Sequence, residues 1–262
     1  MTIVMNRREL VSGLAAGTVV AFAGGTSGCV ENPALGRRQM LLVTDEQLAA
    51  LSQSAWSQLR QQQPISRNST YNRRLQTTGD RIVSASGLTG QNWEYTVFES
   101  DQINAFVMPG GKVGFTSGIL HITDNHDQVA TVMGHEVGHV AGRHAAERYS
   151  QAIAANAALT ATNIALQSQD VRFSQEIAAI LGAGVSFGIL LPYSRKHEYE
   201  ADRLGVQYMA QANYNPREAL NFWQTMAGMN QGNKPLEFMS THPSDTNRIR
   251  EMDGVIRRLG YV

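Results

Sequence analysis

The sequence predicts one α+β domain that is mostly helical, and three observations lead to this fold class. Apolar residues recur at helical spacing over most of the chain after Asp124. Three short segments rich in β-forming residues lie between Trp93 and Phe115. No internal repeat or low-complexity linker interrupts residues 40–262. A few strands followed by a long run of helices are typical of the α+β class.

The composition is that of a globular protein and excludes several other classes. Of the 262 residues, 42% are apolar, which is too many for a disordered chain. The 22 basic residues balance the 22 acidic ones without forming a basic tract, so we expect no nucleic-acid partner. A single cysteine excludes an internal disulfide framework and a cysteine-rich zinc finger.

The N-terminus is typical of an export signal. Arginines at positions 7 and 8 precede residues 10–29, which carry no charge. Five glycines in that stretch disfavour the alternative, a membrane-spanning helix. The arginine pair resembles a twin-arginine signal, and residues 26–29 (Thr-Ser-Gly-Cys) resemble a bacterial lipobox, in which the cysteine is lipidated. We therefore expect a signal peptide over residues 1–29.

Cys29 is the expected lipid attachment site, and the alternative is that it is a small apolar residue of the signal. The mature chain is almost neutral, so attachment to the membrane would come from acyl chains. Val30 is not the aspartate that retains many bacterial lipoproteins in the inner membrane, which favours the outer membrane. We expect a periplasmic lipoprotein in which residues 30–43 form a tether.

The folded domain is expected over residues 44–262 and begins with two helices. Thr44 and Gln47 form a capping box, which starts a helix that ends before Pro64. A second helix is expected over residues 71–84.

Three strands are expected over residues 93–98, 103–108 and 111–115. The first alternates and is rich in β-formers. The other two flank Pro109-Gly110-Gly111, which is typical of a tight turn.

The chain after Asp124 is expected to be helical almost to its end. An Asn-Pro pair at positions 215–216 with Glu218 is typical of a helix start, and Ser244 is expected to start the last helix. Residues 177–191 are strongly apolar but short for crossing a bilayer, so we prefer a core helix to a surface segment that touches a membrane.

The strongest chemical motif is His-Glu-Val-Gly-His at residues 135–139, which matches the H-E-x-x-H pattern. On a helix His135 and His139 lie on one face, so both imidazoles can bind one zinc ion. Glu136 lies beside them and can take a proton from the attacking water. The alternative is a surface helix with incidental histidines, and the apolar face of this segment argues against it.

A catalytic zinc site needs a third protein ligand and an open position for water. The candidates are Glu198 and Glu200. Glu198 and Asp202 share a helix face, which suits Glu198 as ligand and Asp202 as the acceptor for the N–H of a ligand histidine. By spacing alone, a charged and solvated helix face is an equal alternative.

Four segments of the chain carry a family resemblance. They are the H-E-x-x-H motif, Glu198-x-x-Ala201-Asp202, Asn104-Ala105-Phe106 with Pro109-Gly110-Gly111, and Thr241-His242-Pro243-Ser244 with Arg248. In their order along the chain, beginning with Asn104-Ala105-Phe106, these segments resemble the HtpX/CAAX-prenyl-protease family of zinc metallopeptidases, most of all its periplasmic lipoprotein branch (LoiP/BepA-like). The resemblance implies a gluzincin-type domain with a small antiparallel sheet beside the H-E-x-x-H helix.

The resemblance also implies roles for individual residues. It makes Glu198 the third ligand of one Zn²⁺ per chain, beside His135 and His139. Glu136 would activate the water. His242 is the candidate donor to the oxyanion, and a structural role for it is equally compatible.

Other residues have weaker assignments. Tyr193 and Tyr199 are further candidates for the oxyanion donor. His144 is expected to be structural, and His197 an ordinary surface histidine. The segment Asn104-Ala105-Phe106 would lie in an edge strand that pairs with an extended peptide substrate.

These motifs lead to three hypotheses for the function. We prefer a zinc-dependent endopeptidase of the bacterial envelope that degrades misfolded or misassembled proteins. The second is a non-catalytic chaperone or assembly lipoprotein with structural zinc, in which Glu136 would have no use. The third is a processing protease of narrow specificity. The expected partners are unfolded or misassembled envelope proteins and, through the lipid anchor, a membrane.

Overall fold

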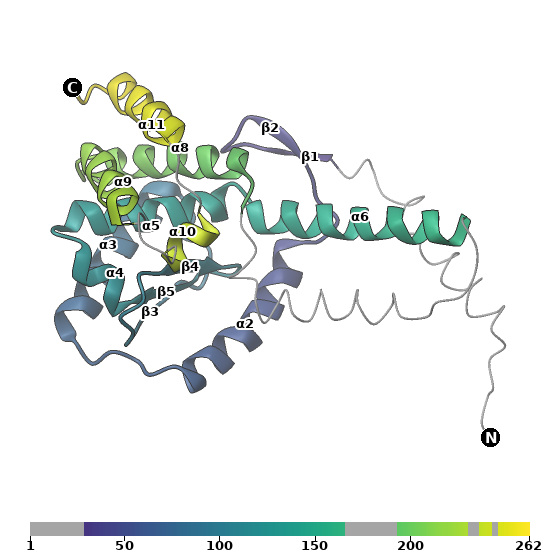
Figure 1. Ribbon diagram of the computed structural model, residues 1–262, viewed down its shortest axis with the longest axis horizontal. Helices are drawn as coiled ribbons and strands as arrows, with labels where there is room; N and C mark the ends of the chain where they lie inside the picture. The colour runs from purple at the N-terminus through teal and green to yellow at the C-terminus, as the bar shows by residue number, and fades with distance from the viewer. Residues whose placement is uncertain (1–28, 166–192, 230–235, 243–245) are drawn as a thin grey trace.

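The computed structural model describes residues 29–165, 193–229, 236–242 and 246–262. In this part of the chain, helices surround a small three-stranded sheet, and the long helix α6 (His144–Ala165) extends away from the rest (Figure 1). The expected mostly helical α+β fold is therefore confirmed. Apart from Cys29, the expected signal peptide lies outside the described residues, as does the apolar stretch 177–191.

The first described residues form a hairpin, and it lies within the segment expected to be a tether, residues 30–43. β1 (Cys29–Asn32) and β2 (Arg37–Met40) pair antiparallel. Two polar side chains of the hairpin, Asn32 and Gln39, are buried, and both donate hydrogen bonds to the helical part of the domain. Because polar contacts hold this hairpin, its sequence lacks the apolar alternation that signals a strand.

Two helices follow as predicted. α2 (Asp45–Gln62) begins at Thr44, whose hydroxyl accepts from the backbone N–H of Gln47, while the Gln47 side chain accepts from the Thr44 N–H. The predicted capping box is thus confirmed. α3 (Ser69–Ser86) begins at Asn68, whose side chain also accepts backbone N–H groups.

The sheet is mixed, which corrects the expected antiparallel sheet. β3 (Glu94–Phe98), β4 (Ala105–Met108) and β5 (Lys112–Thr116) lie in the order β3-β5-β4. β4 and β5 pair antiparallel around a turn with positive φ at Gly110 and Gly111, but β3 pairs with β5 in parallel. Because β5 is buried along its whole length, burial favours it in the centre, between the two strands that precede it. β4 is left as an edge of the described sheet, as the resemblance implied.

Helices make up most of the remaining described residues. They are α4 (Ser117–Ile122), α5 (His126–Ala141), α6, α8 (Arg195–Gln211), α9 (Arg217–Met229), α10 (Glu237–Thr241) and α11 (Thr246–Arg258). The predicted start of α9 is confirmed, since Asn215 Oδ1 accepts from the N–H of Arg217. Ser244, which was predicted to start the last helix, lies outside the described residues.

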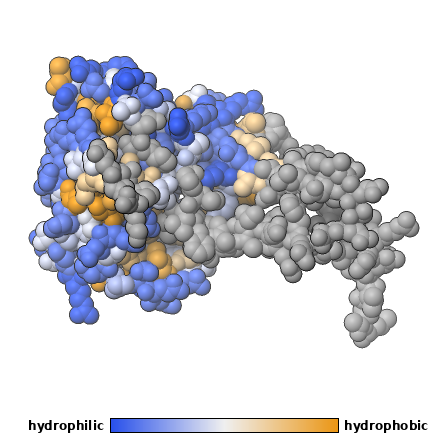
Figure 2. Space-filling model, viewed as in Figure 1, coloured by the Kyte–Doolittle hydropathy of each residue, from blue (hydrophilic) through white to orange (hydrophobic). Residues whose placement is uncertain are grey.

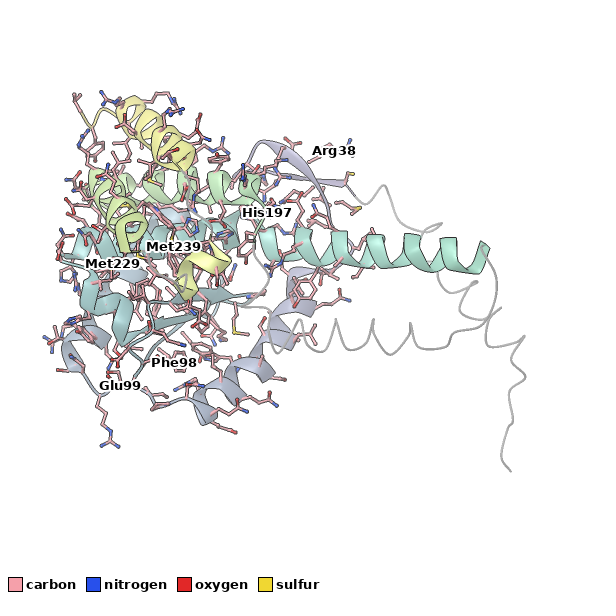
Figure 3. The ribbon with its side chains drawn as sticks, viewed as in Figure 1. Arg38, Phe98, Glu99, His197, Met229 and Met239 are labelled. Carbon is pink, nitrogen blue, oxygen red and sulfur yellow. The ribbon has the colours of Figure 1, made fainter. Side chains whose placement is uncertain are left out.

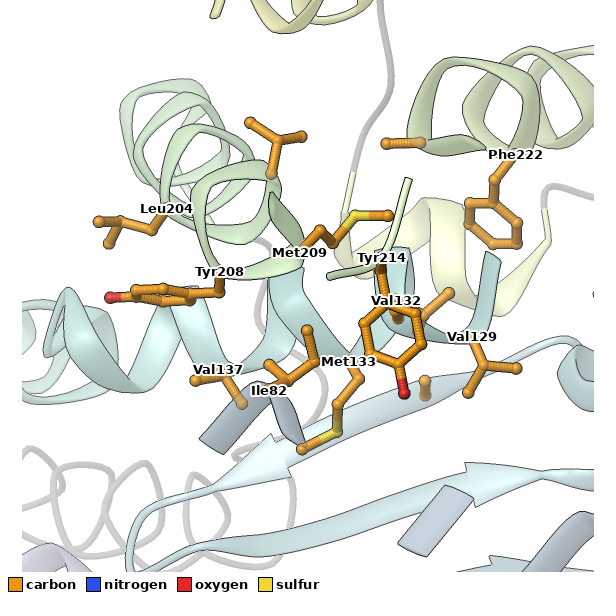
Figure 4. Close-up of a cluster of buried hydrophobic side chains, with 14 of the residues drawn as sticks. Ile82, Val129, Val132, Met133, Val137, Leu204, Tyr208, Met209, Tyr214 and Phe222 are labelled. Atoms are coloured by element: carbon orange, nitrogen blue, oxygen red, sulfur yellow. The ribbon is translucent and has the colours of Figure 1, made fainter. Parts of the chain in front are cut away.

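The main hydrophobic core lies where α5 meets α3 and α8 (Figure 4). Val132 and Met133 of α5 contribute to it together with Ile82 of α3 and Met209 of α8, and all four are fully or almost fully buried. Burial of such side chains is the main stabilising term for a domain of this kind.

Glycines set the distance between α5 and α8. A Cβ added to Gly138 would lie 2.6 Å from the backbone oxygen of Ala201, and one added to Gly134 would lie 2.9 Å from that of Gly205. Contacts this short would force the two helices apart. The small residues therefore allow a close approach, which brings the polar side chains of α5 and α8 together.

The visible face of the described residues is largely hydrophilic, with small scattered apolar patches (Figure 2). The exposed large apolar side chains in this part of the chain are Val30, Leu42, Leu51, Ile65, Met229, Leu259 and Val262. None of the helices within the described ranges has both the length and the apolar character needed to cross a membrane.

Candidate active site

α5 presents the two motif histidines to the interior. The helix begins at Asn125, whose side chain accepts from the N–H of Gln128. His135 and His139 lie one turn apart, and both are almost fully buried. Their Nε2 atoms approach to 3.1 Å. Two nitrogens at this separation can bind the same metal ion.

α8 brings Glu198 to the same point. One Glu198 oxygen lies 3.4 Å from His139 Nε2, and the other lies 3.5 Å from His135 Nε2. Glu200, the other candidate from the sequence, is hydrogen-bonded to His144 instead. The geometry therefore favours Glu198 over Glu200 as a metal ligand.

His242 directly follows α10 and completes the cluster. Its Nδ1 lies 3.1 Å from His135 Nε2 and 3.2 Å from Glu198 Oε1. Ligand atoms of His135, His139, Glu198 and His242 all lie within 4.8 Å of one another, and the four residues are buried. His242 is thus a fourth residue that could contact a metal ion here, and its Nε2 faces Glu136 Oε1 at 3.4 Å.

The donor set fits zinc. Two imidazoles and a carboxylate are the protein ligands of one common kind of catalytic zinc site. Bonds of about 2.0–2.1 Å in a tetrahedron separate the ligand atoms by about 3.3 Å. The separations between His135, His139 and Glu198 are 3.1, 3.4 and 3.5 Å. One Zn²⁺ per chain therefore suits the residues present, in agreement with the predicted cofactor.

Asp202 and Arg248 lie behind the cluster. Asp202 Oδ1 is 2.9 Å from His135 Nδ1, so it can accept the N–H that orients this histidine. Arg248 of α11 donates to both Asp202 oxygens at 2.7 Å, and its Nη1 lies 2.9 Å from Glu198 Oε2. Its guanidinium also lies 4.2 Å from the ring centroid of Trp223. Arg248 thus neutralises two buried carboxylates.

The site shifts the pKa values of its two glutamates in opposite directions. Burial works against ionisation of Glu198, but the neighbouring His242 and Arg248 outweigh it and hold the pKa of Glu198 well below its usual value. Burial raises the pKa of Glu136. Glu198 is therefore suited to be an anionic ligand at neutral pH, and Glu136 to accept a proton there.

Glu136 lies between α5 and the edge strand β4. Burial raises its pKa, and the backbone of Val107 in β4 is among the groups that act against this shift. Its Oε1 makes no hydrogen bond to the described residues, and the nearest cationic candidate, His242 Nε2, is 3.4 Å away. A buried carboxylate oxygen without a hydrogen-bond donor is available to take a proton.

A cavity of about 490 Å³ opens beside the cluster. Leu48 of α2, Val107 of β4 and Pro109 of the following turn contribute to its lining, and His139 and Tyr193 form the part next to the cluster. Tyr193 stacks on His139 with ring centroids 3.9 Å apart. The metal-binding cluster therefore adjoins a cleft along an edge strand.

The predicted substrate-binding residues lie at this strand but do not line the cleft. Asn104, Ala105 and Phe106 are buried, and Phe106 packs against aromatic side chains of α2 and β3. A substrate at this edge would therefore meet the β4 backbone rather than these side chains. Tyr199 lines a different groove, between α8 and α11.

Sequence reasoning missed a group of polar residues next to His139. His197, expected to be an ordinary surface histidine, is 4% exposed and stacks on His144 at 4.5 Å between ring centroids. Glu200 contacts both His144 and Arg37 of the hairpin. Arg37 and Glu200 are 163 positions apart, so no local spacing in the sequence could have linked them.

Comparisons with known proteins agree with this geometry. Residues 69–256 match the model of Peptidase family M48. The mitochondrial metalloendopeptidase OMA1 of Schizosaccharomyces pombe is 39% identical over 176 residues, which cover 66% of this chain and 49% of that protein. The β-barrel assembly-enhancing protease of Escherichia coli is 28% identical over 202 residues, which cover 74% of this chain and 40% of that protein. The chain thus spans about half the length, or less, of these relatives.

Proposed function

Because the chain belongs to peptidase family M48, we propose that it hydrolyses peptide bonds in misfolded or misassembled proteins of the bacterial cell envelope. Family membership and relatives named as metalloendopeptidases make it a zinc-dependent metalloendopeptidase. This leaves the non-catalytic chaperone hypothesis without support. The proposal is carried by the buried cluster of His135, His139 and Glu198 with Glu136 at its side, beside an edge strand.

The mechanism follows from the positions of these side chains. A zinc ion held by His135, His139 and Glu198 would polarise the scissile carbonyl and make water more acidic. Glu136 takes the proton of the attacking water and passes it to the leaving amine. His242 Nε2 lies 3.4 Å from Glu136 Oε1, and this position beside the proton acceptor supports His242 as the group that donates to the developing oxyanion.

Substrate binding is proposed to use the free edge of β4. An extended peptide can add to such an edge through backbone hydrogen bonds, which require no particular side chains. Val107 and Pro109 line the adjoining cleft next to His139, so a peptide paired with β4 would pass the cluster. Unfolded segments adopt this extended form readily, which favours misfolded proteins as substrates.

The proposed location is the periplasm, with a lipid anchor on Cys29. The E. coli and Yersinia pestis relatives are named for β-barrel assembly, which supports an envelope protein. Cys29 is exposed at the start of β1 and is the only cysteine. Radioactive fatty acid supplied to cells should label the wild type and not Cys29→Ala. Equal labelling of both proteins, or of neither, would contradict the anchor.

The proposed substrate class is tested by mapping cleavage sites. Purified full-length protein is incubated with unfolded casein and, separately, with a natively folded protein of similar size, and the products are identified by mass spectrometry. We expect many cleavage sites in casein and none in the folded protein, because only extended segments can pair with β4.

The processing protease of narrow specificity is the second candidate. It is favoured by the higher identity, 39%, to a relative that is named as a mitochondrial endopeptidase. Two outcomes would support this candidate and refute a role in general degradation. One is cleavage of casein at a single site. The other is cleavage of the folded protein at a single site while casein stays intact.

A further inference from the structure

A chain of hydrogen bonds leads from His139 to the N-terminal hairpin. His139 Nδ1 lies 2.9 Å from His144 Nδ1, and His144 Nε2 lies 3.1 Å from Glu200 Oε2. Glu200 in turn accepts from Arg37 of β2, at 2.6 Å from Nε and 2.7 Å from Nη2. Four residues from four different elements are thus joined in one row.

The direction of each bond is fixed by the metal site. His139 faces the cluster with Nε2, so a bound metal needs the lone pair of that nitrogen and leaves the proton on Nδ1. His144 Nδ1 must then accept this proton's hydrogen bond, which places the proton of His144 on Nε2. That N–H donates to Glu200, whose charge is matched by Arg37. The donor and the acceptor of every hydrogen bond in the row are therefore assigned consistently.

Arg37 anchors the far end of the row. Besides Glu200, it donates to both carboxylate oxygens of Glu147 on α6, at 2.9 and 2.7 Å. The Arg37 side chain is 17% exposed, and those of Glu147 and Glu200 are 9% and 13% exposed. The planar guanidinium is the group that can hold two carboxylates in fixed positions at once.

The hairpin also holds the end of the metal-binding helix. The Asn32 amide donates to the backbone oxygen of Ala141 at 3.1 Å, and the Gln39 amide donates to that of Gly142 at 2.7 Å. These are carbonyl groups at the C-terminal end of α5, which lack partners within the helix. The hairpin is therefore built against the helix that carries His135 and His139.

We propose that the β1–β2 hairpin supports the metal site, with Arg37 as a positioning residue that sets the orientation of His139 through Glu200 and His144. This inference rests on the metal site of the proposed function. Outer hydrogen-bond partners of a ligand histidine fix its ring and its tautomer, and their loss typically weakens metal binding about 10–100-fold. The segment expected to be a tether thus becomes part of the site.

The test compares Arg37→Gln with Arg38→Gln in the full-length protein. Arg38 is the matched control because it neighbours Arg37 on β2, is exposed and projects away from the helices (Figure 3). The one hydrogen bond described for its side chain is to the backbone oxygen of Cys29. Zinc affinity is measured by competition with a chelator, and the ligand geometry by the visible spectrum of the Co²⁺-loaded protein. The melting temperature of the metal-free protein is recorded for each variant.

We expect Arg37→Gln to weaken zinc binding about tenfold and to change the Co²⁺ spectrum. Arg37→Lys should fall between this variant and the wild type, because lysine keeps the charge but cannot hold two carboxylates in a fixed geometry. Arg38→Gln should leave both measurements unchanged. His144→Phe, which keeps a ring against His197 but removes the acceptor for His139, should weaken zinc binding at least as much as Arg37→Gln.

The proposal is overturned if Arg37→Gln keeps the wild-type affinity and Co²⁺ spectrum, even if its melting temperature falls, since that would be a purely structural role. If Arg37→Gln does not fold, His144→Phe decides, and an unchanged spectrum in that variant refutes the positioning row. A wild type that binds no zinc would instead refute the metal site and the proposed function with it.

Discussion

Replacing Glu136 with glutamine should abolish peptide-bond hydrolysis while leaving zinc binding intact. Glutamine has nearly the same shape but cannot accept a proton from water. General acid–base catalysis typically contributes about 10²–10⁴-fold to a rate, so we expect a loss of at least this order. Glu136 is not among the four clustered ligand residues, so the zinc content should stay at the wild-type level. The measurement is the initial rate of casein cleavage, with zinc determined on the same preparation.

The matched control for this variant is Glu99→Gln. Glu99 is exposed and directly follows β3, near the lower left of the view (Figure 3), and no described contact joins its side chain to the cluster. The control should cleave casein at the wild-type rate. Residual activity in Glu136→Gln equal to that of Glu99→Gln would show that another group is the base.

Replacing Arg248 with methionine should destabilise the metal-free protein by about 3–5 kcal/mol, the range for removing one partner of a buried ion pair. Arg248 is 3% exposed and faces both Asp202 and Glu198, so its loss leaves two buried carboxylates without a compensating charge. Urea unfolding monitored by circular dichroism measures the loss of the free energy of unfolding. Added zinc should recover part of it, because a cation bound by Glu198 replaces one of the lost charge contacts.

Arg257→Met is the control on the same helix. Arg257 is paired with Asp253 one turn away, but its side chain is 58% exposed. Exposed pairs of this kind contribute only about 0–1 kcal/mol, so the free energy of unfolding should change little. Similar losses in the two variants would mean that general damage to α11, and not the buried charges, explains the effect of Arg248→Met.

Local sequence patterns predicted the parts of the fold that depend on local physics. Three examples are the capping box at Thr44, the turn at Gly110-Gly111 and the start of α9. In each, residues only a few positions apart determine the local structure. The same holds for the metal site. His135 and His139 lie one turn apart, and the family resemblance selected Glu198 as a ligand, which spacing alone left open against a charged and solvated helix face.

Long-range contacts explain what could not be predicted. The parallel pairing of β3 with β5 depends on which strand takes the central position in the sheet. That position is set by packing against the rest of the domain and cannot be predicted from the strand sequences alone. The hairpin that replaces the expected tether is held by Arg37 and Gln39 through contacts more than 100 positions away. Likewise, the sequence makes His242 a candidate oxyanion donor or a structural residue, and only the fold reveals that it lies among the residues that could hold a metal ion.

Catalysis is proposed to depend on one zinc ion held by His135, His139 and Glu198. The most direct test measures zinc content and casein cleavage on the same samples of full-length protein, as purified, after a chelator, and after zinc is restored. We predict one zinc per chain, loss of cleavage when it is removed, and recovery in proportion to the zinc that returns. Undiminished cleavage by the zinc-free protein would show that hydrolysis does not depend on zinc.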